Sequence, residues 1–427
     1  MTVRMDSVIK SIATALDSVE HELLGASTNH GRRISVLCAK MGNVLGKSDE
    51  EIANIANCAL LHDNALTEFI HTELKNRHGE YQPAPKSAEV DVIPVWDIKT
   101  HCKYGQRNVD ALHFKTNVKD FILYHHERAD GKGPFGIREG EGSVESELIA
   151  IADTLDVTYH LQNITQENLC SIRKTIAEES GKAFSKAAVQ AMLEILDWPT
   201  ILSLKDDVIR ETSETAFIPW VADMEEETVF GLAGFITKII DYKSVFTRKH
   251  STQLANKAWL MSGHYNYDKM QRIKLYLAAS LHDIGKLKTP TAVLEKPGKL
   301  TDEEFLIIKD HIRQTWELLK DIEGFETVCT WASNHHETLT GTGYPFGKKA
   351  EELDFNSRLL ACLDIYQAVS EERPYHPARD HESTMQVLHK MAGDGKIDKD
   401  IVKDILFALA PYDGKDLPPP EWDLWRK

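Results

Sequence analysis

The feature that most constrains the fold of this chain is an internal repeat in the spacing of its histidines. In both halves, the first and second histidines lie 32 residues apart, and the third and fourth lie 24 residues apart. These residues are His30, His62, His101 and His125 in the first half, and His250, His282, His311 and His335 in the second. A repeat of this kind indicates duplicated structural units, so we expect two copies of one domain of roughly 190 residues.

The copies differ in the interval between the second and third histidines, which is 39 residues in the first half and 29 in the second. We expect the extra residues to form a loop within 77–95, where glycine and prolines punctuate the sequence. Residues 218–220, with a central proline, indicate a turn between the copies. We therefore predict an N-terminal domain over 1–205, a junction over 206–226 and a C-terminal domain over 227–427.

Both copies have the sequence pattern of helices. Thr301 and Glu304 have the spacing of a capping box, and Ile308 and Ile312 follow at helical spacing. This pattern places His311 in the middle of a helix. Alternation with a period of two residues is rare throughout the chain, so we predict an all-α fold.

Composition excludes several classes of protein. The formal net charge is -16, with 50 Lys and Arg against 66 Asp and Glu and no basic run, which argues against a nucleic acid polymer as the main ligand. No apolar run of about 18 residues exists, so we expect no membrane span. The N-terminal stretch has the pattern of a short amphipathic helix and not that of a signal peptide. Six cysteines without a Cys-x-x-Cys pair indicate reduced thiols in a cytoplasmic protein.

The adjacent residues His282 and Asp283 offer one nitrogen and one oxygen ligand, and a carboxylate can bridge two metal ions. Such a pair alone is more often a buried histidine that is hydrogen-bonded to a carboxylate. Further histidines and an aspartate in the same half favour a metal site, and mixed imidazole and carboxylate ligands suit Fe or Mn. The candidate ligands are His250, His282, Asp283, His311, His335, His336 and Asp364.

The second half resembles the HD-GYP family of bacterial cyclic-dinucleotide phosphodiesterases, which act in second-messenger signalling. The motifs that carry the resemblance are His250-Ser251, His282-Asp283-Ile284-Gly285-Lys286, His311, His335-His336-Glu337, Gly343-Tyr344-Pro345 and Asp364-Ile365-Tyr366. The resemblance implies two tandem HD-type helical domains, of which the second is an HD-GYP domain. It also implies two divalent metal ions, one held by His250, His282, Asp283 and Asp364, and the other by Asp283, His311, His335 and His336.

In this family the metal pair, bridged by Asp283, would direct water at phosphorus and yield a linear 5′-phosphorylated dinucleotide. Lys286 would neutralise the charge that develops on the phosphate oxygens. Tyr344 and Arg373 would contact substrate, although Tyr344 could instead pack its loop and Arg373 could form a surface ion pair. Phe246 stands where some members have a glutamate for a third metal, so the resemblance implies a binuclear site.

Two departures from the family pattern bear on the substrate. Thr338 and Thr340 stand where a basic residue and an aspartate are common, and His376 replaces another basic residue. These changes put cyclic di-GMP in doubt as the best substrate. A tandem chain with a decayed first copy is similar to the phosphodiesterases specific for 3′,3′-cyclic GMP-AMP, which favours that dinucleotide.

The first copy keeps a full set of candidate ligands: His30, His62, Asp63, His101, His125, His126 and Asp153. Leu66 stands at the position of Lys286, however, and Gly133-Pro134-Phe135 at that of the Gly-Tyr-Pro motif. Losing such a charge commonly costs on the order of 10²–10³ in rate. We expect this copy to bind metal but to catalyse poorly, or to serve as a scaffold.

Two alternatives remain open from the sequence. An HD-superfamily nucleotidase would share the first ligands but would not need His311 and the paired histidines of the second metal. A non-catalytic cyclic-dinucleotide sensor would not need Lys286. For all three functions, we expect the two domains to pack against each other, and the sequence is compatible with a homo-oligomer.

Overall fold

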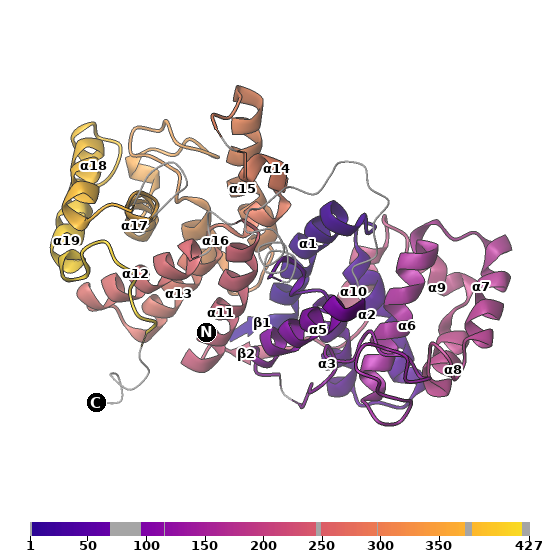
Figure 1. The fold of residues 1–427 in the computed structure, drawn as a ribbon. Helices are drawn as coiled ribbons and strands as arrows, with labels where there is room; N and C mark the ends of the chain where they lie inside the picture. The colour runs from indigo at the N-terminus through magenta and orange to yellow at the C-terminus, as the bar shows by residue number, and fades with distance from the viewer. Residues whose placement is uncertain are drawn as a thin grey trace. The chain divides into compact units, whose positions relative to one another are not determined.

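The computed structural model describes residues 2–68, 95–114, 116–244, 249–296, 298–371 and 378–420 (Figure 1). The chain divides into two compact units, one of Arg4–Ala222 and one of Asp223–Lys427 together with Met1–Val3. Within the described residues the only strands are β1 (Thr2–Arg4) and β2 (Val221–Asp223), which pair with each other. All other regular structure there is helical, which confirms the predicted all-α fold.

The unit Arg4–Ala222 is built around α2, which packs against α1, α3, α6, α8 and α10. Ser48 caps α3 by accepting a hydrogen bond from the Glu51 amide, and the Glu51 carboxylate accepts one from Ser48 in return. Most of the loop predicted within 77–95 lies outside the described residues. The helices are α1 (Met5–Leu24), α2 (His30–Val44), α3 (Asp49–Leu60), α5 (Val95–Asp110), α6 (Val144–Tyr159), η1 (Leu161–Asn163), α7 (Gln166–Glu178), α8 (Lys186–Ile195), α9 (Trp198–Ser203) and α10 (Ile209–Thr215).

In the second unit, α12 packs against α11, α13 and α17, while α15 packs against α16 and η2. The capping box predicted at Thr301 and Glu304 is confirmed, because each side chain accepts a hydrogen bond from the other's amide. The helices are α11 (Glu226–Tyr242), α12 (His250–His264), α13 (Lys269–Leu281), η2 (Ile284–Lys288), α14 (Thr291–Leu294), α15 (Asp302–Leu319), α16 (Glu326–Ser333), η3 (Ala350–Glu352), α17 (Phe355–Ser370), α18 (His381–Gly393), α19 (Lys399–Ala408) and η4 (Ala410–Tyr412).

The two units share several features in the same order along the chain. The first histidine of each copy, His30 or His250, is the first residue of a helix, α2 or α12. The turns that follow α7 and α18 contain Gly181 and Gly395, whose φ angles of 71° and 69° favour glycine. No helix in the described part of the chain is long and apolar enough to cross a membrane.

The short helix η2 is fixed tightly against α15. An ideal Cβ on Gly285 would lie 1.9 Å from the carbonyl oxygen of His311, so only glycine fits here. Thr315 Oγ1 accepts a hydrogen bond from the Gly285 amide at 3.1 Å and donates one to the His282 carbonyl at 2.9 Å. This packing brings the His282-Asp283 pair beside His311.

Candidate metal centre

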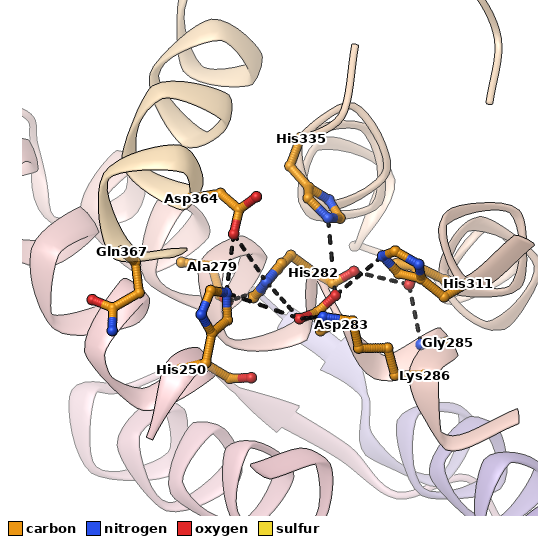
Figure 2. Close-up of polar contacts among 12 residues, drawn as sticks. His250, Ala279, His282, Asp283, Gly285, Lys286, His311, His335, Asp364 and Gln367 are labelled. Atoms are coloured by element: carbon orange, nitrogen blue, oxygen red, sulfur yellow. Dashed lines mark hydrogen bonds and ion pairs between the residues drawn. The ribbon is translucent and has the colours of Figure 1, made fainter. Parts of the chain in front are cut away.

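The candidate ligands of the C-terminal unit converge from several helices on one cluster (Figure 2). They occupy the start of α12, the turn between α13 and η2, the middle of α15, the turn after α16 and the middle of α17. Six are buried and one is half-buried. The buried six are His250, His282, Asp283, His311, His335 and Asp364, and the half-buried one is His336.

Asp283 lies between two groups of histidines. Its Oδ2 is 3.1 Å from His282 Nε2 and 4.0 Å from His250 Nε2. Its Oδ1 is 3.2 Å from His311 Nε2 and 4.0 Å from His335 Nε2. The two carboxylate oxygens therefore face different histidines, an arrangement that suits a carboxylate shared by two cations.

Asp364 and His336 lie at the edges of these groups. Asp364 Oδ1 is 3.0 Å from His250 Nε2 and 3.8 Å from His282 Nε2. His336 has a ring nitrogen within 4.8 Å of nitrogens of His311 and His335. The geometry thus brings together every one of the seven residues singled out in this half of the sequence.

Three of the histidines have a fixed tautomer. His282, His311 and His335 each place Nδ1 at 2.5 to 2.7 Å from the backbone carbonyl three residues earlier in the chain. Because a carbonyl oxygen only accepts, each Nδ1 carries a proton, and in the neutral ring each Nε2 keeps its lone pair.

These Nε2 atoms, together with Asp283 Oδ1, are buried and have no hydrogen-bond partner among the described residues. Buried polar atoms in a folded protein are normally paired. Three imidazole nitrogens and a carboxylate oxygen left unpaired in one small volume are a donor set that suits divalent metal ions. The cluster therefore fits a metal centre.

The electrostatics of the cluster keep Asp283, His335 and His336 in the form that a metal binds. Burial alone would raise the pKa of Asp283, but His282 and Lys286 hold it well below the usual value for aspartate. Burial and the neighbouring His336 lower the pKa of His335 well below the usual value for histidine, and burial lowers the pKa of His336 to about 4. The carboxylate is thus ionised and both histidines are neutral at neutral pH.

Lys286 stands at the rim of the cluster. Its Nζ donates a hydrogen bond to Asp283 Oδ2, and its side chain is 19% exposed. An ammonium group that borders both the cluster and solvent is suited to meet an anionic ligand.

The glycine-rich loop after the paired histidines is held by Glu337, which is 3% exposed. Its carboxylate accepts hydrogen bonds from the amides of Phe346 at 2.7 Å, Gly347 at 3.2 Å and Lys348 at 3.0 Å. An ideal Cβ on Gly343 would lie 2.5 Å from Glu337 Cα, so the loop needs glycine there. Sequence reasoning named Glu337 only as part of a motif and missed that it fixes the loop.

The loop places Tyr344 against the cluster. Its ring centroid lies 5.0 Å from that of His336, and Lys309 Nζ lies 4.9 Å from the centroid of the tyrosine ring. Tyr344 is half-buried, so one side of it faces solvent. Arg373, the other residue expected to contact substrate, lies outside the described residues, as do Phe246 and His376.

The N-terminal unit repeats the cluster. One group comprises His30, His62 and Asp153, and the other Asp63, His101, His125 and His126. His62 and His125 again place Nδ1 near the carbonyl three residues earlier, at 2.9 and 2.6 Å, and their Nε2 atoms have no hydrogen-bond partner in the described part of the chain. All seven residues expected from the sequence are therefore brought together here as well.

The structure corrects the alignment of the two glycine-rich loops. Glu127 accepts a hydrogen bond from the Phe135 amide, as Glu337 does from the Phe346 amide, so Phe135 corresponds to Phe346. The first copy therefore lacks any residue at the position of Tyr344, because its loop is one residue shorter. The sequence comparison had instead matched Gly133-Pro134-Phe135 to Gly343-Tyr344-Pro345.

Sequence reasoning also missed Glu371. Its Oε2 lies 2.9 Å from His250 Nδ1, on the side of the ring that faces away from Asp364. Glu371 directly follows the last residue of α17 and lies seven residues after Asp364. Seven residues are about two helical turns, so the two carboxylates point to the same side of the helix. That spacing was the available signal.

Comparison with known proteins places this arrangement in a family. A family model described as "HD domain" matches residues 28–158, and a second with the same description matches residues 235–401. The 3′3′-cGAMP-specific phosphodiesterase 1 of Vibrio cholerae serotype O1 is 28% identical over 401 residues, which are 91% of this chain and 88% of that protein. The 3′3′-cGAMP-specific phosphodiesterase 3 of the same organism is 30% identical over 300 residues, which are 69% of this chain and 63% of that protein.

A solved structure supports the fold. The crystal structure of the V. cholerae cyclic GMP-AMP-specific phosphodiesterase V-cGAP3 is similar to this structure with a TM-score of 0.64 and 23% sequence identity. The similarity covers 96% of this chain and 98% of that chain. The chain therefore belongs to the HD-domain family, with two HD domains in tandem, and its second domain carries the HD-GYP motifs identified in the sequence.

Proposed function

We propose that the protein is a metal-dependent phosphodiesterase that hydrolyses a cyclic dinucleotide to a linear 5′-phosphorylated dinucleotide. The observation that carries the proposal is the C-terminal cluster, in which Asp283 faces two groups of histidines with unpaired nitrogens. We assign catalysis to residues 227–427, and assign residues 1–205 to a second HD domain joined by 206–226.

The C-terminal cluster would hold two divalent ions, for which Fe and Mn both suit the mixed ligands. His250, His282 and Asp364 would hold one ion, His311, His335 and His336 would hold the other, and Asp283 would be shared between them. When bound, such a pair lowers the pKa of water and polarises a phosphodiester.

The chain's own residues then orient the substrate and stabilise the developing charge. Lys286 lies beside the shared carboxylate and reaches solvent, so it meets the non-bridging oxygens of a phosphodiester. Tyr344, whose ring packs at a tilt against that of His336, offers the exposed part of its ring to a base or ribose.

We infer that 3′,3′-cyclic GMP-AMP is preferred over cyclic di-GMP. The two V. cholerae relatives named for the hybrid dinucleotide support this preference. In the loop, Thr338 and Thr340 replace charged residues that are common in the family, and with Thr342 they form a triangle of hydroxyl groups with oxygens 2.9 to 3.1 Å apart. The first copy instead has the ion pair of Arg128 and Asp130 in the corresponding turn.

The N-terminal cluster binds metal without supporting catalysis. It has a full donor set, but Leu66 stands at the position of Lys286 and the position of Tyr344 is missing. Both groups that would act on substrate are therefore absent from this copy, while the groups that would hold metal remain.

The test is turnover of 3′,3′-cyclic GMP-AMP and cyclic di-GMP by Mn- or Fe-loaded protein, with Asp283→Ala as the control. We expect hydrolysis of both, faster for the hybrid, and none by the variant. Better hydrolysis of cyclic di-GMP would overturn the preference. Binding of either nucleotide without hydrolysis would instead identify a sensor.

A further inference from the structure

His250 is supported from the side opposite its cluster-facing nitrogen. Its Nε2 lies 3.0 Å from Asp364, and its Nδ1 lies 2.9 Å from Glu371 Oε2. A carboxylate at Nδ1 accepts the ring proton and leaves Nε2 to face the cluster. Glu371 is thus the group that orients this histidine.

Behind Glu371 lies a buried cation. Gln367 Nε2 donates a hydrogen bond to Glu371 Oε2 at 3.3 Å, and Lys257 Nζ donates one to Gln367 Oε1 at 2.6 Å. Figure 2 shows Gln367 on the same helix as Asp364, beside His250. Lys257 is only 2% exposed. The amide therefore links a buried ammonium to the carboxylate that orients His250.

The burial of Lys257 is costly and calls for an explanation. A charged amine loses its hydration in the interior, and burial lowers the pKa of Lys257 to about 8. An apolar side chain would fill the same space without that cost. The first copy does so, since the spacing from its first histidine places Leu37 at the position of Lys257.

The first copy supports its own histidine by a different set of residues. His30 Nδ1 lies 2.7 Å from Asp156 Oδ2, and Arg33 Nε donates to Asp156 Oδ1 at 2.8 Å. Asp156 follows Asp153 by three residues, as Gln367 follows Asp364. Both copies thus place a carboxylate on the first histidine and a buried cation behind it, but the residues that provide them differ.

We propose that Lys257 is a positioning residue of the C-terminal metal centre, which acts through Gln367 and Glu371 to hold His250. The inference rests on the proposed function only in taking the cluster as a metal centre. Loss of a group that supports a metal-bound histidine typically weakens metal affinity about 10- to 100-fold. We expect Lys257→Met to weaken Mn²⁺ binding at one C-terminal position by this factor.

The experiment is a calorimetric titration of the metal-free full-length chain with Mn²⁺, supported by elemental analysis after dialysis against a chelator. The N-terminal cluster serves as an internal reference, because the Asp156 and Arg33 contacts that support His30 are unchanged in these variants. The matched control is Lys10→Met, because Lys10 is 3% exposed and is held by Asp6 and Glu214. We expect Lys10→Met and Lys257→Arg to bind Mn²⁺ as the wild type does, and the turnover lost in Lys257→Met to return at saturating Mn²⁺.

A Lys257→Met protein that folds and binds Mn²⁺ with wild-type affinity would overturn the inference and leave Lys257 as a core residue. If Lys257→Met does not fold, Gln367→Met breaks the same link while keeping the ammonium, and it must show the same 10- to 100-fold loss. A wild-type chain that binds no Mn²⁺ would refute the metal centre itself, which is a separate outcome.

Discussion

The hydrogen bonds that Glu337 accepts from the glycine-rich loop lead to a prediction about catalysis. In Glu337→Gln, one oxygen can still accept from the amides of Phe346 and Gly347, but the new NH₂ group faces the donating amide of Lys348. Hydrogen bonds to charged groups contribute about 1.5–3 kcal/mol each, and a buried donor without an acceptor costs a similar amount. We expect the held loop conformation to be disfavoured by about 2–3 kcal/mol.

That free energy corresponds to a fall in kcat/KM of roughly 30- to 160-fold if productive binding needs Tyr344 in place. The assay is steady-state hydrolysis of 3′,3′-cyclic GMP-AMP, with metal content measured on the same samples. Metal content should be unchanged, because Glu337 is not one of the ligands.

The matched control is Glu127→Gln in the first copy, where Glu127 accepts hydrogen bonds from the amides of Phe135 and Ile137. This variant should disturb its own loop to a similar degree and leave kcat/KM within about twofold, because that loop has no counterpart of Tyr344. Wild-type kcat/KM in Glu337→Gln, or equal losses in both variants, would refute the reasoning.

Three further predictions concern single side chains. Lys286→Leu should lower kcat about 10²- to 10³-fold while elemental analysis still finds the wild-type metal content; loss of metal would contradict a role toward substrate. Gly285→Ala should lower the unfolding free energy by more than about 3 kcal/mol in denaturant titration, because its Cβ would overlap the His311 carbonyl, whereas Gly234→Ala, with open space around it, should not. Burial raises the pKa of Glu20 from 4.5 to about 8; since the native state holds this proton more tightly than the unfolded state, stability of the metal-free protein should fall by up to about 1.4 kcal/mol per pH unit between those values. Glu20→Gln should remove this dependence, and an unchanged slope in pH-dependent unfolding would show that the proton is elsewhere.

The sequence was sufficient to predict much of the fold and of the cluster because both depend on local patterns. The capping box at Thr301 and the helical spacing after it are properties of a short stretch, and the structure confirms them. The repeated intervals between histidines predict which residues correspond over longer distances. They do so only because both copies have the same spacing there. His311 lies in mid-helix, as this pattern predicts.

What the sequence did not reveal depends on contacts between distant residues. Lys257 and Gln367 are 110 positions apart, and nothing in either neighbourhood marks them as a pair. The missing counterpart of Tyr344, in contrast, had a signal in the sequence. Pro134-Phe135-Gly136 repeats Pro345-Phe346-Gly347 when a one-residue gap is placed at Tyr344, and the hydrogen bonds of Glu127 and Glu337 agree with this alignment.

The proposed difference between the copies, with catalysis in the second alone and a candidate metal cluster in both, has a physical basis in where the residues lie. His30, His62 and His125 are at most 2% exposed, so each is part of the core of its unit. Replacing one would leave a cavity and unpaired neighbours, which costs several kcal/mol of stability. Lys286 and Tyr344 lie at the rim and are partly exposed, so replacing either leaves no buried cavity. A copy that is not required to catalyse is therefore expected to change at the rim more readily than in its buried cluster, and the first copy, with Leu66 and the shorter loop, differs from the second at the rim while keeping the cluster.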